Sequence, residues 1–171
     1  MIGKNDHGFT LIELAIYGGL LGILLVILSE FFVALLNVQL VSSADTAVDQ
    51  DGKYIVARMS YDFKRAKAIL APSLGQAAAT VSATINDAGT DYTYRYALTN
   101  TNLLLTVGAS AATPLNSDAT KVTSFSVSRI GNSGQSGSAK DTLQISFTLQ
   151  SVASTSSGRN QAQYQTTVSL R

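Results

Sequence analysis

Residues 8–14 read GFTLIEL and open an apolar run that continues to residue 36 with few polar interruptions. The part from 11 to 28 is long enough to cross a bilayer, which takes about 20 residues. Glu13 lies near its start, and a charged side chain inside a membrane helix costs about 2.5–3.5 kcal/mol. The run therefore predicts a membrane-spanning helix whose one early carboxylate meets a partner.

The apolar pattern changes after residue 36. From 41 to 70 apolar residues recur at steps of three, four or seven, which is typical of one face of an amphipathic helix. Basic residues near its end suit the helix dipole, and Pro72 predicts where it stops. The predicted buried face consists of Val41, Ala44, Val48, Ile55, Met59, Phe63, Ala66 and Leu70.

Beyond Pro72 the pattern alternates between apolar and polar residues. Such alternation indicates antiparallel strands with one buried face and one solvated face. We expect strands over residues 81–85, 92–98, 103–107, 122–129, 143–149 and 164–170. The apolar face of a sheet needs a cover, which the helical stripe supplies. The predicted fold is α+β: a long N-terminal α-helix, membrane-spanning in its first half, packed on an antiparallel β-sheet.

The GFTLIE stretch resembles the prepilin signal of type IV pilins and of the pseudopilins of type II secretion. The resemblance implies a leader over residues 1–8, cleavage between Gly8 and Phe9, and N-methylation of the new Phe9 amine. It also implies that Glu13 pairs with the N-terminal ammonium of a neighbouring subunit during filament assembly. Residues 9–36 would then form the transmembrane and filament-core helix, 37–72 the amphipathic half, and 73–171 the globular sheet domain.

The same resemblance sets the expected function and partners. The chain would be a structural subunit of a pilus or a secretion pseudopilus, inserted in the bacterial inner membrane before assembly. Its partners would be other pilin subunits, a prepilin peptidase that cleaves and methylates it, and the inner-membrane assembly platform. Afterwards it would reside in a periplasmic pseudopilus or a cell-surface pilus. A pattern similar to J-type pseudopilins and W-type minor pilins implies a minor subunit: Arg58, Asp62, Lys64, Ala66 and Lys67, followed by strands 92–98 and 103–107.

Composition argues against an enzyme. The chain has no cysteine, and its one histidine, His7, lies in the expected leader. The mature chain would thus lack the commonest general base, thiol nucleophiles and the usual zinc ligands. We expect no catalytic residues, no metal and no cofactor. The net charge of +1 gives no reason to expect nucleic-acid binding.

Several features of the sequence have two possible interpretations. Gly18 and Gly22 have the spacing of a close helix-packing motif, or occur by chance in a glycine-rich run. Glu30 reaches the headgroups, or forms a second ion pair between subunits. The row Tyr92, Tyr94 and Tyr96 is a packed strand face or, together with the loop 131–138, a ligand platform. The last choice leaves an alternative function, a filament-tip adhesin or a DNA-uptake binding module.

Overall fold

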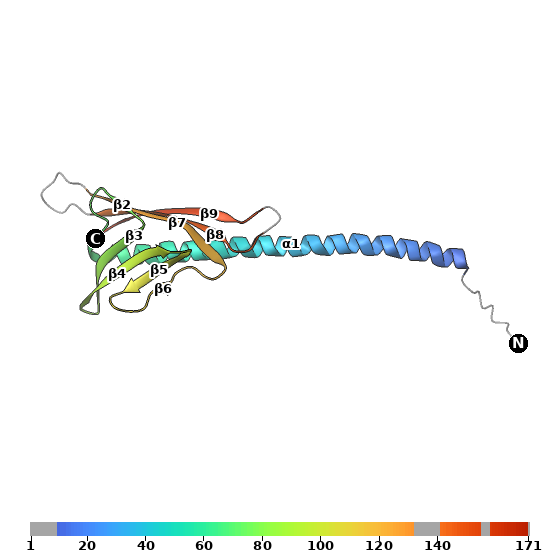
Figure 1. Cartoon of the computed structure of the whole chain (residues 1–171), viewed down its shortest axis with the longest axis horizontal. Coiled ribbons are helices and arrows are strands. Elements are labelled where there is room, and N and C mark those ends of the chain that lie inside the picture. Colours follow the sequence, from blue (N-terminus) through green and yellow to red (C-terminus); the bar gives the residue numbers. More distant parts are fainter. Residues whose placement is uncertain (1–9, 132–140, 155–157, 171) are drawn as a thin grey trace. The chain divides into compact units, whose positions relative to one another are not determined.

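The computed structural model of the protein describes residues 10–131, 141–154 and 158–170 (Figure 1). The expected cleavage site at Gly8 and Phe9 and the loop from 132 to 138 lie outside these residues. The chain divides into two compact units, Met1–Gln39 and Leu40–Arg171. One helix, α1 (Leu11–Lys64), contributes its first part to one unit and its second part to the other. The predicted α+β class, with a long N-terminal helix packed on antiparallel strands, is confirmed.

The part of α1 in the second unit is amphipathic, as the spacing of its apolar residues predicts. Of the predicted face, Val41 is half-buried and Leu70 is 56% exposed; the others are buried. The structure adds two small or polar residues to the buried face of the helix, Gly52 and Asp62. The buried members of the prediction are Ala44, Val48, Ile55, Met59, Phe63 and Ala66.

The helix ends earlier than expected. An amphipathic half that runs to residue 72 is wrong beyond Lys64, because β1 (Ala66–Ala71) is a strand. The register of β1 on β3 shifts twice, so its two buried residues, Ala66 and Ile69, lie three positions apart. A regular strand would bury alternate residues. Because of these shifts, the buried residues of β1 have the spacing expected of a helix face. The sequence pattern therefore could not distinguish this strand from a continuation of α1.

The strands form two antiparallel sheets rather than one. The first has the order β1-β3-β4-β5-β6 and the second the order β2-β7-β8-β9. Six strands lie where alternation predicts them, and the short β2 and β6 were not predicted. The bounds are β2 (Ala77–Ala78), β3 (Thr80–Asp87), β4 (Thr90–Thr99), β5 (Asn102–Val107), β6 (Thr113–Pro114), β7 (Thr120–Ile130), β8 (Thr142–Ser151) and β9 (Gln161–Ser169).

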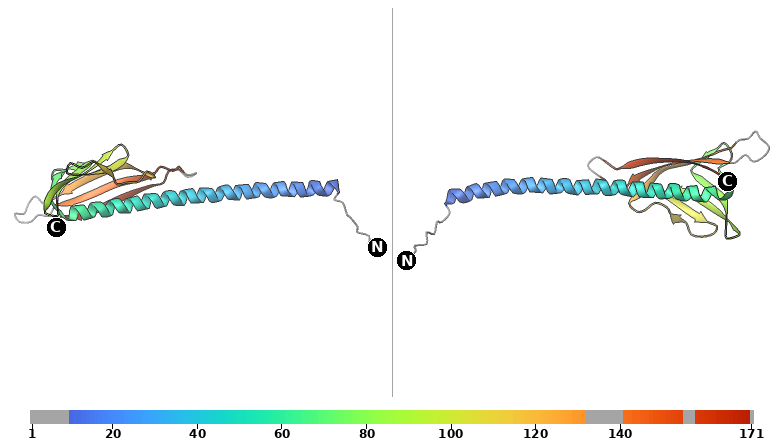
Figure 2. Two further views of the ribbon diagram at one scale, coloured as in Figure 1. Left: turned by 90° about the horizontal axis from the view of Figure 1, so that it is seen from below. Right: turned by 180° about the vertical axis from the view of Figure 1, so that it is seen from behind.

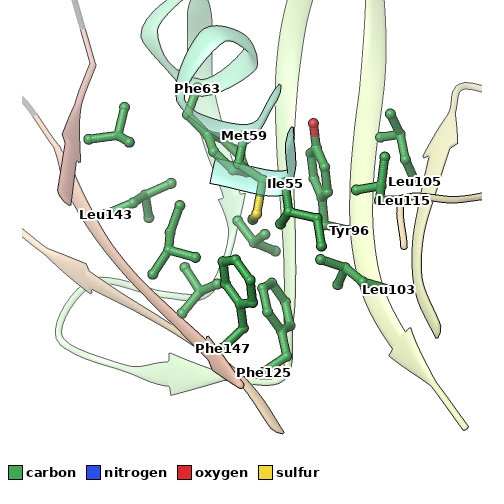
Figure 3. Packing of buried hydrophobic residues seen from close by; sticks show 14 of the residues in the cluster. Ile55, Met59, Phe63, Tyr96, Leu103, Leu105, Leu115, Phe125, Leu143 and Phe147 are labelled. Carbon is green, nitrogen blue, oxygen red and sulfur yellow. The ribbon is translucent and has the colours of Figure 1, made fainter. Parts of the chain in front are cut away.

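Both sheets share one hydrophobic core with α1. Figure 3 shows the helix side chains between residues of the first sheet and residues of the second. The rings of Phe63 on α1 and Tyr96 on β4 meet with their centroids 5.4 Å apart. The second part of α1 is therefore covered on its apolar face by both sheets. The labelled core residues are Ile55, Met59, Phe63, Tyr96, Leu103, Leu105, Leu115, Phe125, Leu143 and Phe147.

A buried carboxylate joins the end of α1 to the first sheet. Asp62 is fully buried, and its oxygens accept from Arg58 Nε at 2.9 Å, from Arg65 Nη2 at 3.2 Å and from the Tyr96 hydroxyl. Burial raises the pKa of Tyr96, and the hydrogen bond to Asp62 raises it further, so the phenol remains the donor. A buried charge is tolerated when it is paired and hydrogen-bonded in this way.

The second sheet is held on α1 by an aromatic ring. Tyr164 of β9 donates its hydroxyl to the Val48 carbonyl at 3.1 Å and stacks on Phe147 with ring centroids 5.2 Å apart. A methyl group at Gly52 would lie inside the Tyr164 ring. Gly52, which breaks the apolar stripe in the sequence, is therefore a contact point for β9 within the helix.

Replacing Asp62 by Ala should lower the free energy of unfolding by about 3–5 kcal/mol, because two guanidinium groups and a buried phenol lose their acceptor. Denaturant unfolding of the full chain in detergent, followed by circular dichroism, measures this loss. The control is Asp45→Ala, an exposed acid on the same helix, which should change stability by less than about 0.5 kcal/mol. Equal losses for the two variants would contradict the role of Asp62.

Replacing Gly52 by Ala should destabilise the fold by about 1–3 kcal/mol through overpacking, although alanine normally favours a helix by about 1 kcal/mol. The same unfolding measurement applies. Gly22→Ala is the matched control, since a methyl group there meets no atom within 4 Å. The loss should disappear in a Tyr164→Leu background; a loss that persists there would place the clash elsewhere.

Candidate functional site

The apolar start of α1 is the candidate site, and a threonine fixes where it begins. The Glu13 backbone N–H donates to Thr10 Oγ1 at 3.3 Å, and the Leu14 N–H donates to the Thr10 carbonyl at 3.1 Å. Thr10 is thus the N-cap, and Glu13 is the third residue of the helix. A threonine followed three positions later by a glutamate is the sequence signature of a capping box. Sequence reasoning missed Thr10, although its spacing from Glu13 could have identified it.

The helix dipole stabilises the Glu13 carboxylate in part. A negative charge in the first turn gains about 0.3–1 kcal/mol from the dipole. The cost of a charge in a membrane helix is larger, about 2.5–3.5 kcal/mol at its centre. Within the described part of the chain Glu13 has no ion-pair partner. In an apolar environment a cation from another molecule would offset the remaining cost.

The rest of this helical segment is apolar and uncovered. Its large apolar side chains between Leu11 and Leu40 are between 46% and 88% exposed. The helix is long and apolar enough to cross a membrane. Burying one such side chain is worth about 1.5–3 kcal/mol. Together they make covering this surface worth tens of kcal/mol, which is the dominant physical property of the site.

Three small residues interrupt the bulky surface. At Gly18, Gly19 and Gly22 an added methyl group would meet no atom within 4 Å. These glycines are therefore not required by contacts inside the chain among the described residues. Small residues at a spacing of four let a second helix approach closely in lipid. Ser29 does not add an unsatisfied group, since its hydroxyl donates to the Leu25 carbonyl at 2.8 Å.

Glu30 is exposed and has no ion-pair partner among the described residues. It is the second carboxylate of the segment, and it lies in the middle of the helix, where no cap or dipole end supports it. Both interpretations of Glu30, a side chain that reaches the headgroups and an ion pair with another subunit, remain predictions.

The tyrosine row is mainly a packed strand face. Tyr94 and Tyr96 are 4% and 0% exposed, while Tyr92 is 41% exposed. The buried pair contacts the α1 end through Arg65 and Asp62. Tyr94 and Tyr96 are therefore not available as a ligand platform, and the companion loop lies outside the described residues apart from Gly131.

Comparison of the chain with protein-family models, curated proteins and solved structures found no match. The function must therefore be argued from the residues of the site.

Removing the cap should loosen the start of the helix. Thr10→Ala should cost about 1 kcal/mol of local stability, which speeds amide exchange at residues 13 and 14, whose N–H groups bond to Thr10, about fivefold in the full chain in detergent. Thr46→Ala is the control, because the Thr46 hydroxyl bonds to a carbonyl inside the same helix, Ser42 O at 2.8 Å. Unchanged exchange at residues 13 and 14 in Thr10→Ala would mean that the threonine does not cap the helix.

Proposed function

We propose that the chain is a structural subunit of a type IV pilus or a type II secretion pseudopilus, and that it assembles through the N-terminal part of α1. The observation that carries this proposal is the uncovered apolar segment with a carboxylate in its capped first turn. A single membrane anchor would explain the apolar surface alone. It would give no reason for an acid three residues into the helix.

A filament of parallel copies explains both properties. Before assembly the bilayer covers the apolar side chains; in the filament the same helices of neighbouring copies cover one another. Each copy then supplies a cation for the next, the methylated amine of Phe9, to the carboxylate of Glu13. An opposite charge at close range offsets the cost of a few kcal/mol that the helix dipole leaves. Gly18 and Gly22 would allow two helices to approach closely.

The resemblance of residues 8–13 to the prepilin signal supports the same function and extends it. In this proposal a prepilin peptidase cuts after Gly8 and methylates Phe9, and an assembly platform in the bacterial inner membrane extracts the subunit. The similarity around the end of α1 to J-type pseudopilins and W-type minor pilins favours a minor subunit. The finished filament would lie in the periplasm or on the cell surface.

Replacing Glu13 by Ala should leave cleavage and folding intact and reduce incorporation into filaments at least about tenfold. A tenfold change corresponds to about 1.4 kcal/mol. This is within the free-energy cost that the proposed ion pair of Glu13 would offset. Incorporation is measured as the share of the subunit in sheared or sedimented filaments relative to membranes. Mass spectrometry of the same samples gives the mature N-terminus.

Two variants separate charge from shape. Glu13→Gln keeps the size and should fail like Glu13→Ala. Glu30→Gln removes the other carboxylate of the segment: normal assembly would favour a side chain that reaches the headgroups, and reduced assembly a second ion pair between subunits. Normal assembly of Glu13→Gln would remove the proposed ion pair. A mature protein that still begins at Met1 would count against the whole proposal.

A further inference from the structure

Four described strands lie at the edges of the two sheets, and three of them offer little to a new strand. β2 and β6 each have two residues, and β6 contains Pro114. β1 has two register shifts against β3. Short strands, prolines and irregular pairing are the usual means by which proteins keep sheet edges from pairing with other chains.

The fourth edge, β9, has none of these protections. It runs from Gln161 to Ser169, pairs with β8 at nine successive positions without a register shift, and contains no proline and no charged residue. At an edge, every second residue presents its N–H and C=O groups away from the sheet. Among the described residues, the hydrogen bonds of the β9 backbone lead to β8 alone. This edge is therefore a regular row of unused donors and acceptors.

Two hollows of opposite charge lie between β9 and α1. Near Gln161 a hollow of about 360 Å³ is lined by Asp45 and Asp49. Near Ser169 a hollow of about 820 Å³ is lined by Lys64 and Lys67, with Arg65 beside them. β9 lies along α1 in the same direction as the helix (Figure 2). The contact of Tyr164 with Val48 lies between the residues of the two hollows. The strand edge thus has an acidic start and a basic end.

We propose that β9 receives an added strand from a different polypeptide chain. The partner is an extended, mostly uncharged segment that bonds to the outward-facing backbone groups of β9. Strand addition of this kind takes its affinity from main-chain hydrogen bonds and its specificity from side-chain sites along the edge. Asp49 is already paired with Lys53, and Lys67 with Asp91. The partner therefore has a basic residue against Asp45 and an acidic residue against Lys64. Within the described chain neither Asp45 nor Lys64 has an ion-pair partner.

Pairing of β9 with β9 of a second copy fits less well in either direction. Antiparallel pairing would reverse the second part of α1 of one copy relative to that of the other, since β9 and that part of α1 run in the same direction. The parallel copies of the proposed function cannot pair in that way. Parallel pairing would place the acidic hollows side by side and the basic hollows side by side, where like charges repel. The charges and the parallel arrangement of copies together favour a different chain.

A photo-crosslinking residue, p-benzoylphenylalanine, placed singly at the exposed positions Gln163, Gln165 and Thr167 of the full chain in its native membrane tests the proposal. The expected result is an adduct with one other protein at all three positions. For each step of two residues along β9, the residue number of the crosslinked position in that protein should rise or fall by about two, as strand pairing requires. The matched control is the same residue at Ala68, which is exposed on the irregular β1 edge and should give no such series.

Charge at the edge should abolish the adduct. Gln163→Lys together with Gln165→Lys should lower the Thr167 adduct at least fivefold, and so should Lys64→Glu. The control Ser126→Lys places a lysine at an exposed position of β7, an internal strand that does not pair with β9, and should leave the yield unchanged. No adduct, an adduct with a second copy only, or contacts without a continuous register would each overturn the proposal.

Failure here is distinguishable from failure of the proposed function. A chain that assembles in a Glu13-dependent manner but gives no β9 adduct overturns the strand addition alone. A β9 adduct in ordered register from a chain whose Glu13→Gln variant assembles normally overturns the ion pair alone.

Discussion

No other described residues cover the large apolar side chains of α1 between Leu11 and Leu40. This exposed apolar surface is the constraint on which the other features of the segment depend. Water is an unfavourable environment for such a surface by tens of kcal/mol. A bilayer or a group of similar helices provides the cover, and both tolerate few charges. Each polar group in this segment must therefore be satisfied locally, as at Ser29, or by another molecule.

The two carboxylates Glu13 and Asp62 illustrate the difference between the two parts of α1. Asp62 is fully buried and receives two guanidinium groups and a phenol from its own chain. Its charge is matched before any other molecule is present, so it stabilises the fold. The Glu13 backbone N–H donates to Thr10, but its carboxylate receives only the field of the helix end. In the proposed function this incompletely matched charge favours association, whereas the charge of Asp62 is already matched within the chain.

Sequence patterns predicted the elements whose side-chain period is regular. The apolar face of α1 and the six longer strands follow from spacing alone. The end of α1 did not, because the register shifts of β1 place Ala66 and Ile69 at a helical spacing. The role of Gly52 also required the structure, because its partner Tyr164 lies more than a hundred residues away and no local pattern links them. At the site, Glu13 stood out as a charge in an apolar run. Thr10 was not predicted, because the capping-box spacing between Thr10 and Glu13 was not recognised.

The edge of β9 and the start of α1 have one property in common, although the groups involved differ. In each, a regular array of groups is left without partners: apolar side chains on the helix, backbone donors and acceptors on the strand. The fold limits the equivalent exposure elsewhere, since both sheets cover the second part of α1 and β1, β2 and β6 are irregular or short. Three sheet edges are short or irregular, whereas the fourth is regular over nine residues. We therefore interpret the open edge of β9, like the uncovered part of α1, as a surface that binds another molecule.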